Sequence, residues 1–346
     1  MPPLRSGVLP YDDGNLLSLC DAMLKKILTI GVFILIGLLA TIASMLFFPV
    51  ENPLPAPLAQ ISYASFDDAI RAIPTLDVTE SDKLRDDCRS IALHSGKKEA
   101  RVVVLLHGYT NCPKQFLELG ERIHAQGVNV LIPRAPGHGY ADRATDALSF
   151  VTAKDFLTYT HASIAIADAM GDTVTLVGLS GGGTLTLWAA LFEPAVDEFI
   201  AIAPVAYPRG FEPLLRNAVI RYAAWTPSEF SWWDKEQKER LPGPAHAYRG
   251  YASRSMGAIL HIAAFAEQQL RPGVLSKKMT FIINEADKAL REDSLLMLAD
   301  KFARAGADVR TIVFEKALGY PHDLIDPENI QEKKDAVYDV FMKTLQ

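Results

Sequence analysis

The fold is most constrained by a regular alternation of short apolar runs with helical stretches, which begins near residue 90. The apolar runs cover residues 90–95, 101–108, 128–133, 173–180, 198–205, 278–287 and 309–316. Helical spacing fills most of the gaps, over 113–127, 152–171, 183–193 and 291–307, and again at the end over 327–345. Alternation of this kind predicts an α/β fold with a mostly parallel sheet covered by helices on both faces. We expect the first two runs, which flank a turn, to form a strand pair.

Composition and charge narrow the possible partners. The 346 residues are 49% hydrophobic and 22% charged, with a formal net charge of −6. These values are typical of a globular protein. Because no tract rich in Lys or Arg occurs, nucleic acid is not an expected partner. Composition does not predict an oligomeric state.

The N-terminal part contains a segment that could cross a membrane. Residues 27–48 carry no charge, and as a helix at ~1.5 Å per residue they would extend roughly 33 Å, enough for a bilayer core of ~30 Å. Lys25 and Lys26 precede the segment, and no Lys or Arg follows it until Arg71. The positive-inside rule therefore predicts a single-pass anchor with residues 1–26 in the cytoplasm and the rest outside it.

Two alternatives compete with an anchor. A cleavable signal peptide has a shorter apolar core and a small-residue cleavage site, whereas this run ends in the bulky residues SMLFFPV. A buried core helix is rarely apolar on all sides over such a length. After the anchor, residues 49–60 are rich in proline, which favours an extended, semi-rigid spacer that holds the globular part, 61–346, off the membrane.

Residues 206–270 interrupt the alternation and show no clear strand of their own. The stretch contains Trp225, Trp232 and Trp233. An insertion of this length is either a lid over a site or an additional helical part of the core. Its aromatic residues suit an apolar chain that enters beneath a lid, and ordinary core packing explains them equally well.

The stretch 176–190, LVGLSGGGTLTLWAA, places Ser180 between an apolar strand and a helix. Gly178, Ser180 and Gly182 fit the pattern G-x-S-x-G, in which a sharp strand-to-helix turn exposes the serine hydroxyl above the sheet. The helix that begins at Gly181 directs amide N–H groups at the same place. Ser180 is therefore the candidate nucleophile. The alternatives are a glycine-rich turn with an idle serine and a nucleotide-binding turn, which would require G-x-G-x-x-G spacing in the first strand–helix unit.

A serine hydroxyl needs a base at neutral pH, and His322 is the candidate. It lies in the loop LGYPHD, after the last predicted strand and before the terminal helix. Reactive residues of such sheets gather in loops beyond the carboxyl ends of the strands. His107 and His138 lie at the same edge, but each precedes a glycine in a turn, where a structural hydrogen bond is the better interpretation. His246 and His261 lie in or near the long insertion.

The base needs a carboxylate that fixes its tautomer and stabilises the imidazolium. Asp287 follows the strand MTFIIN and is the natural candidate. Glu285 lies two residues earlier, and Asp293 already belongs to the next helix. Asp323 adjoins His322 in the chain and would have difficulty reaching the ring nitrogen. The alternative role for Asp287 is a helix cap or an exposed acid.

The tetrahedral intermediate of acyl transfer requires hydrogen-bond donors for its oxyanion. The loop LLHGYTN follows the second predicted strand and supplies one candidate, the backbone N–H of Tyr109. The backbone N–H of Gly181 is the second candidate, because it begins the helix after the serine. His107 and Gly108 would shape the loop so that the amide faces inward.

Three cysteines are present, at positions 20, 88 and 112. Cys20 lies on the proposed cytoplasmic side. Cys88 and Cys112 lie beyond the anchor, where disulfides can persist. Cys88 precedes the first predicted strand and Cys112 follows the second, so neighbouring strands could bring them together in a disulfide. The alternative is two small, unrelated buried thiols.

The motifs HGYT, PRAPGHG, GLSGGG, NEADKAL and GYPHD, in that order, resemble the α/β-hydrolase superfamily. Within it the chain looks most like the group of monoacylglycerol lipases, carboxylesterases and serine aminopeptidases. The resemblance covers about residues 88–346. It implies Ser180 as nucleophile, Asp287 as acid and His322 as base, with Tyr109 and Gly181 as oxyanion amides. Thr110 occupies a position where the group commonly has a small residue, so the resemblance does not predict the shape of the acyl pocket.

The resemblance implies a serine hydrolase that forms an acyl-enzyme, and the anchor favours lipid or other apolar acyl esters as substrates. Peptidase, thioesterase and acyltransferase activities use the same machinery, and a non-catalytic binding module of this fold is a further alternative. No cofactor is implied. No HExxH motif or cluster of His, Cys and Asp indicates a metal. Acyl length and substrate identity are not predicted.

Overall fold

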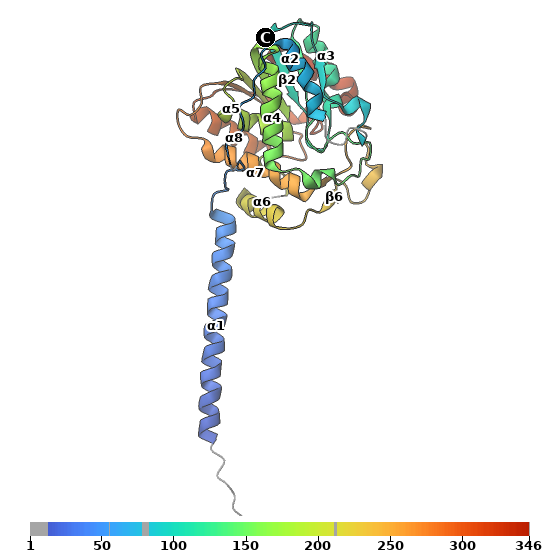
Figure 1. Cartoon of the computed structure of the whole chain (residues 1–346). Coiled ribbons are helices and arrows are strands. Elements are labelled where there is room, and N and C mark those ends of the chain that lie inside the picture. The colour runs from blue at the N-terminus through green and yellow to red at the C-terminus, as the bar shows by residue number, and fades with distance from the viewer. Residues whose placement is uncertain (1–12, 55, 78–82, 211–212, 346) are drawn as a thin grey trace, which may run out of the picture. The chain divides into compact units, whose positions relative to one another are not determined.

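A computed structural model describes residues 13–54, 56–77, 83–210 and 213–345 (Figure 1). The contacts within the chain divide it into two compact units, Met1–Phe48 and Pro49–Gln346. Each unit is described by itself.

The first unit contains one long helix, α1, Asp13–Phe47. Its part Cys20–Phe47 is long and apolar enough to cross a membrane, and none of its most apolar window is buried inside the protein. Large apolar side chains such as Leu28 and Phe33 are exposed. This exposure rules out the alternative of a buried core helix. A membrane anchor and a signal sequence both fit a helix of this kind.

The second unit is built on a seven-stranded sheet in the order β1-β3-β2-β4-β5-β8-β9. All neighbouring strands are parallel except β1 and β3. The last residues of β2 and β4 are buried in succession, as expected where both faces of a sheet are covered. The mostly parallel sheet predicted from the sequence is thereby confirmed. The strands are β1 Ile91–Leu93, β2 Glu99–Leu106, β3 Asn129–Ile132, β4 Gly171–Leu179, β5 Glu198–Ile202, β8 Lys278–Asn284 and β9 Asp308–Phe314.

The expected pairing of the first two strands is wrong. β1 pairs with β3 and runs antiparallel to it, with Ile91 opposite Ile132 and Leu93 opposite Val130. β3 is buried along its whole length, and a strand in that position needs a partner on each side. β1 is short and only half-buried, so it suits the edge.

Helices cover the sheet in groups. α4, α5 and α7 pack on one another. α3 and α10 are joined by an ion pair between Lys334 and Glu118 at 2.9 Å and by Arg122, which lies over the ring of Tyr338. The helices of this unit, apart from α6 described below, are α2 Phe66–Ala72, α3 Leu117–His124, α4 Ala153–Asp168, α5 Gly181–Phe192, α7 Ser253–Gln269, α8 Glu292–Arg304, α9 Pro327–Ile330 and α10 Lys334–Thr344.

The insertion 206–270 contains two kinds of structure. Its first part holds α6, Arg216–Trp225, and a two-stranded antiparallel ribbon of β6, Phe230–Trp232, and β7, Gly250–Ala252. The expectation that the stretch has no strand is therefore wrong; three residues per strand are too few to show a sequence period. Its last part is α7, which is largely buried and belongs to the core. The stretch thus combines a cover with a core helix.

The described residues of the proline-rich stretch 49–60 lie along the second unit rather than standing off it as a spacer. Val50 is buried, and Leu54 and Leu58 pack against the core. The carbonyl oxygen of Ala59 accepts a hydrogen bond from His161 Nε2 at 3.1 Å. The apolar residues among and after the prolines explain this, because packing them against the core removes apolar surface from water.

Candidate active site

Ser180 occupies the sharp turn between β4 and α5. Its backbone has φ 56° and ψ −112°, a left-handed region that non-glycine residues rarely adopt. The Ser180 N–H donates to the carbonyl oxygen of Ile202 on the neighbouring strand at 2.8 Å, which holds the turn. A Cβ at Gly182 would lie 2.1 Å from the carbonyl oxygen of Leu106, and one at Gly178 would lie 2.2 Å from that of Gly182. Only glycine fits these two positions.

The side chains of Ser180, His322 and Asp287 are in contact in that order, with the ring of His322 in the middle. His322 Nε2 lies 2.9 Å from Ser180 Oγ, and His322 Nδ1 lies 2.7 Å from Asp287 Oδ2. Asp287 follows β8 and His322 lies in the loop between β9 and α9, so both residues reach the serine from loops at the carboxyl edge of the sheet.

Burial, hydrogen bonds and neighbouring charges together shift the pKa values of His322 and Asp287. Burial alone would lower the pKa of His322, but the hydrogen bond and the charge of Asp287 outweigh it, and the pKa lies above the ordinary 6.5. Burial would raise the pKa of Asp287, but His322 and the N–H groups of Ala289 and Leu290 lower it below 3.8. The ionised carboxylate holds the proton on Nδ1, so Nε2 presents its lone pair to Ser180.

The competing acids have other partners. Glu285 accepts a hydrogen bond from the backbone N–H of Lys316 at 2.8 Å. Asp293 forms an ion pair with Arg291 at 2.8 Å. Asp323 accepts from side-chain amides and from the backbone of the following turn. Of the four candidate acids, Asp287 is the one that contacts the ring of His322.

His107 and His138 hold loops rather than reaching the serine. His107 Nε2 accepts from the backbone N–H of Ala135 at 3.0 Å, and His138 Nε2 accepts from that of Thr110 at 3.2 Å. In each ring Nδ1 donates to a backbone carbonyl oxygen. Burial lowers the pKa of His138 to about 4 and that of His107 well below 6.5, so both rings are neutral.

The two remaining histidine candidates lie in the insertion and contact other groups. His246 is buried with Nε2 2.8 Å from Asp326 Oδ2, although the two atoms are not aligned for a hydrogen bond. His261 Nε2 donates to the carbonyl oxygen of Glu51 at 2.7 Å. These contacts give no support for either residue as the base.

The predicted oxyanion amides lie side by side. A Cβ at Gly181 would lie 3.1 Å from the backbone nitrogen of Tyr109. Within the described residues neither of these two N–H groups donates a hydrogen bond, whereas the adjacent amides of Gly108 and Thr110 donate to side chains at 2.7 and 3.2 Å. Two unengaged donors next to Ser180 are what an oxyanion requires.

Gln115 connects two loops of the site, and no motif or spacing in the sequence points to this role. Its Oε1 accepts from the N–H of Gly108 at 2.7 Å, and its Nε2 donates to Asp323 Oδ2 at 2.8 Å. Gln115 is 1% exposed. Because Asp323 directly follows His322, this one amide links the Tyr109 loop with the histidine loop.

Thr110 shows how the insertion contacts the same loop. Its φ is 68°, a conformation that favours glycine. Its Oγ1 accepts from Trp233 Nε1 at 3.1 Å, and its carbonyl oxygen accepts from the N–H of Tyr248 at 2.8 Å. The hydroxyl of Tyr109 in turn donates to the carbonyl oxygen of Ala252 at 3.1 Å. Threonine at position 110, where the group commonly has a small residue, therefore provides a hydrogen-bond acceptor for the insertion.

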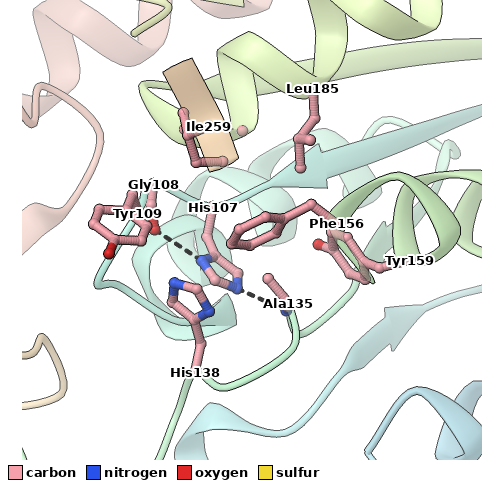
Figure 2. Close-up of a pocket in the computed structure, with 11 residues that line it drawn as sticks. His107, Gly108, Tyr109, Ala135, His138, Phe156, Tyr159, Leu185 and Ile259 are labelled. Carbon is pink, nitrogen blue, oxygen red and sulfur yellow. Dashed lines mark hydrogen bonds between the residues drawn. The ribbon is translucent and has the colours of Figure 1, made fainter. Parts of the chain in front are cut away.

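A small pocket opens beside the two unengaged amides (Figure 2). Its volume is small, about 10 Å³, which is room for about one water molecule, and one side of it is open to solvent. Phe156, Leu185 and Ile259 provide apolar walls, and Tyr109 and Gly181 lie at its edge. In the described part of the chain no group of three or more His, Cys, Asp or Glu residues is arranged to hold a metal ion.

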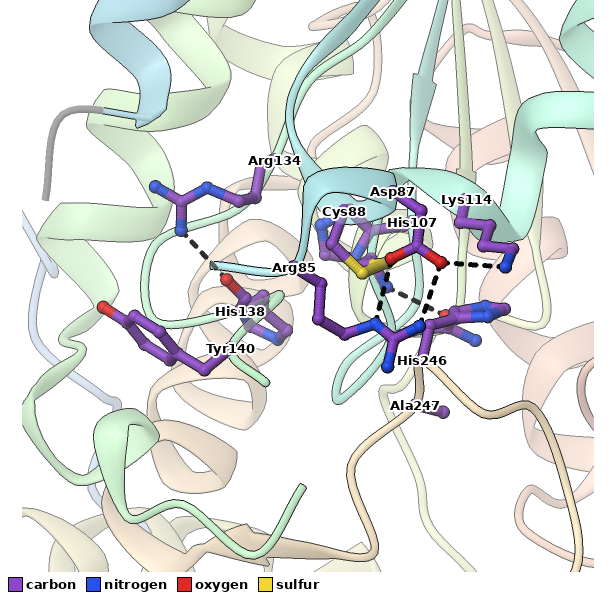
Figure 3. The surroundings of a disulfide bond; sticks show 12 residues. Arg85, Asp87, Cys88, His107, Lys114, Arg134, His138, Tyr140, His246 and Ala247 are labelled. Atoms are coloured by element: carbon purple, nitrogen blue, oxygen red, sulfur yellow. Dashed lines mark hydrogen bonds and ion pairs between the residues drawn. A yellow bond between two sulfur atoms is a disulfide. The ribbon is translucent and has the colours of Figure 1, made fainter. Parts of the chain in front are cut away.

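Cys88 and Cys112 are joined by a disulfide with a Cα–Cα distance of 5.3 Å (Figure 3). The two cysteines meet although β1 and β2 are not neighbours. Because β1 is antiparallel, its first residue lies at the edge where the parallel strands end, and Cys88 comes just before it. Nearby, Asp87 pairs with Arg85 at 2.9 Å and with Lys114 at 2.9 Å, which ties the same two segments by charge.

Known proteins resemble the second unit. The model of the Alpha/beta hydrolase family matches residues 103–326. A thermostable monoacylglycerol lipase of Bacillus sp. (strain H-257) is 31% identical over 102 residues, which are 29% of this chain and 39% of that protein. The chain thus spans about two fifths of the length of that curated relative.

Solved structures show the same fold at low identity. A structure from LipS and LipT, two metagenome-derived lipolytic enzymes, matches with a TM-score of 0.57 and 19% identity. The match covers 75% of this chain and 98% of that chain. The monoacylglycerol lipase of Paleococcus ferrophilus matches with a TM-score of 0.57 and 14% identity. The match covers 74% of this chain and 97% of that lipase chain.

Proposed function

The chain belongs to the alpha/beta hydrolase family, whose model matches more than half of it, and on that premise we propose that it is a serine ester hydrolase of the lipase and esterase kind. In this proposal Ser180 is the nucleophile, His322 the general base and Asp287 the acid that orients it. Tyr109 and Gly181 supply the oxyanion hole.

One observation carries the proposal. The ring of His322 bridges Ser180 Oγ and Asp287 Oδ2 at 2.9 and 2.7 Å, and the serine sits in a strained turn beside two unengaged amides. A serine in a structural turn needs none of these partners. Their combination is the arrangement that activates a hydroxyl for attack on a carbonyl carbon.

The reaction follows from these positions. Ser180 Oγ attacks the ester carbonyl carbon while its proton passes to His322 Nε2, and the carbonyl oxygen becomes an oxyanion that accepts from the two amides. Each such donor contributes ~3–4 kcal/mol in measured cases. The imidazolium then donates the proton to the departing alkoxide, which leaves as an alcohol. Water repeats the sequence on the acyl-enzyme and releases the acid.

The substrates we propose are esters of apolar acyl groups. The walls of Phe156, Leu185 and Ile259 beside the oxyanion amides support an apolar acyl chain. The similarity to a monoacylglycerol lipase supports the same class, although it spans only part of that protein.

We also propose that α1 is a membrane anchor. The length and full exposure of its apolar surface support this proposal, and the lysines that precede residue 27 support a cytoplasmic N-terminus with the hydrolase unit on the other side. The disulfide supports an oxidising compartment for that unit.

A fluorophosphonate probe tests the catalytic assignment. The wild-type protein should be labelled at Ser180, and Ser180→Ala should abolish both labelling and ester hydrolysis. His322→Ala should abolish turnover while the protein keeps its thermal melt. If a well-folded wild-type protein is not labelled and hydrolyses no ester, thioester, amide or lipid in a screen, the chain is a binding module of this fold.

A further inference from the structure

We propose that Asp323 is a positioning residue for the oxyanion hole. Its carboxylate fixes the orientation of two side-chain amides, and these amides hold the loop 108–112 that carries the Tyr109 N–H. This loop is called the oxyanion loop below. The inference rests on the proposed hydrolase function and adds a role for an acid that does not contact the ring of His322.

One oxygen of the Asp323 carboxylate collects three side-chain amides. Oδ2 accepts from Gln115 Nε2 at 2.8 Å, from Asn111 Nδ2 at 3.2 Å and from Asn329 Nδ2 at 2.9 Å. Asn111 belongs to the oxyanion loop, Gln115 lies in the short 3-10 helix Pro113–Phe116 that follows it, and Asn329 lies on α9. Two of the three amides therefore come from the side of the oxyanion loop.

The contacts of this carboxylate suit its ionised form. Oδ1 accepts from the backbone N–H groups of Ile325 and Asp326 at 3.2 and 3.1 Å. Burial and the charge of Asp326 raise the pKa of Asp323 above 3.8. However, the five groups that donate to the two oxygens are all N–H groups, which cannot accept a carboxyl proton. An ionised carboxylate is an acceptor only, so it imposes one direction on every amide that faces it.

Gln115 transmits this direction to the start of the oxyanion loop. The backbone N–H of Gly108 can only donate, and it donates to Gln115 Oε1 at 2.7 Å. The NH₂ group at the other end of the same amide then meets the carboxylate of Asp323. A flipped amide would place oxygen against oxygen at one end and N–H against N–H at the other. Gln115 is buried, so such groups would also lack water.

Asn111 transmits the same direction to the end of the oxyanion loop. Its Oδ1 accepts from the backbone N–H of Cys112 at 2.9 Å, and its Nδ2 donates to Asp323. Asn111 is 7% exposed. The first and the last amide of the oxyanion loop are thus held by side-chain oxygens whose NH₂ groups end on one carboxylate oxygen.

The amides between these ends leave one donor for the substrate. The N–H of Thr110 donates to His138 Nε2 at 3.2 Å, and that of Asn111 donates to the carbonyl oxygen of Gly108 at 3.0 Å. Within the described residues, the N–H of Tyr109 is the one amide of the oxyanion loop that has no acceptor. Because its neighbours are engaged, this N–H is fixed in place and stays available for an oxyanion.

Asp323 connects the oxyanion hole with the base. It directly follows His322, and consecutive Cα atoms lie only ~3.8 Å apart, so a displaced carboxylate would shift the loop of the base as well. One residue thereby sets the positions of both the Tyr109 amide and the His322 ring relative to Ser180.

Asp323→Asn tests this role. The backbone N–H groups that donate to Oδ1 retain the amide oxygen, so the new NH₂ group opposes those of Gln115 and Asn111. We expect kcat for a soluble ester to fall about tenfold or more, with KM changed less than about threefold. Loss of an oxyanion donor costs about 10²–10³ in kcat, and a displaced donor costs part of that.

A reversed hydrogen-bond chain tests polarity apart from packing. In the double variant Asp323→Asn, Gln115→Glu, the new carboxylate accepts from the Gly108 N–H and from the new amide at position 323. We expect kcat to recover about threefold or more over Asp323→Asn, because the pair is coupled. A double variant no faster than Asp323→Asn would overturn the proposal, since a role in packing alone predicts no rescue.

Asn111→Ala and Asn329→Ala are matched variants that decide the proposal even if Asp323→Asn does not fold. Each removes one side-chain amide from Asp323 Oδ2, but Asn111→Ala also leaves the Cys112 N–H without its acceptor. Asn111→Ala should lower kcat about tenfold, and Asn329→Ala should keep it within about twofold. Equal effects of the two variants on kcat would overturn the proposal.

Failure of the inference and failure of the function give different results. If the wild-type protein hydrolyses no ester, the proposed function is wrong and the inference falls with it. If the wild-type protein is active and a folded Asp323→Asn protein keeps its kcat, the inference is wrong and the function stands. Chemical denaturation of the same samples shows whether such a variant loses stability alone, which would make Asp323 a structural residue.

Discussion

Replacing Asp287 by Asn tests how the carboxylate acts on His322. Asp287 Oδ1 accepts from the backbone N–H groups of Ala289 and Leu290 at 2.7 and 3.1 Å, and Oδ2 faces His322 Nδ1 at 2.7 Å. In Asp287→Asn the amide oxygen keeps the two backbone donors, so the NH₂ group must face the ring. A donor in that place forces Nδ1 to lose its proton and Nε2 to carry it.

The expected loss follows from that tautomer. An Nε2 that already bears a proton cannot accept one from Ser180, and a wrong tautomer of this kind costs about 10⁴ in kcat, or about 5 kcal/mol of transition-state stabilisation. Stability should change little by comparison, within about 2 kcal/mol, because both backbone hydrogen bonds remain.

Steady-state hydrolysis of a soluble ester and chemical denaturation measure the two quantities on the same samples. Asp287→Ala is the control, because it leaves the buried N–H groups of Ala289 and Leu290 without an acceptor. It should therefore lose activity and also about 2–4 kcal/mol of unfolding free energy. If Asp287→Asn keeps its activity within tenfold of the wild type, the tautomer argument is refuted and another acid serves His322.

Three further outcomes are expected. The kcat/KM of the wild-type protein should rise with pH as His322 loses its proton, and the midpoint should lie above pH 6.5, because Asp287 raises that pKa; a midpoint below 6.5 would contradict the assigned pair. Gln115→Met, which removes both loop-bridging hydrogen bonds, should cost about 2–4 kcal/mol of unfolding free energy and lower kcat more than it changes KM, and unchanged kinetics would show that the bridge does not position the site. Replacing Cys88 and Cys112 together by Ser should cost about 3 kcal/mol for a cross-link across 24 positions, measured by thermal or denaturant unfolding, and two free thiols in peptides from the native protein would disprove the pairing.

Much of the fold could be predicted because its signals are local. The apolar runs and the glycine stops mark the strands and helices, and the carboxyl-edge rule places Ser180, Asp287 and His322 in neighbouring loops. The order of strands at the edge is not a local property. β3 separates β1 from β2 because a fully buried strand needs two neighbours, which requires knowledge of the whole sheet.

The residues that sequence reasoning missed act through contacts distant along the chain. Gln115 looks like an ordinary polar residue of a helical stretch, and its role depends on Asp323, which is 208 positions away. Thr110 meets Trp233 across 123 positions. Short strands such as β6 and β7 are likewise held by their partner rather than by a pattern of their own.

The crowding around the serine turn determines where this protein can be changed in the laboratory. Any side chain at Gly178 or Gly182 would collide with a backbone carbonyl group at about 2 Å, and backbone cannot move aside as a flexible side chain can. Variants at those two positions are therefore of little use in a mutant library designed for new ester specificities. Diversity is better placed at Leu185 and Ile259, whose side chains line the pocket without holding the turn.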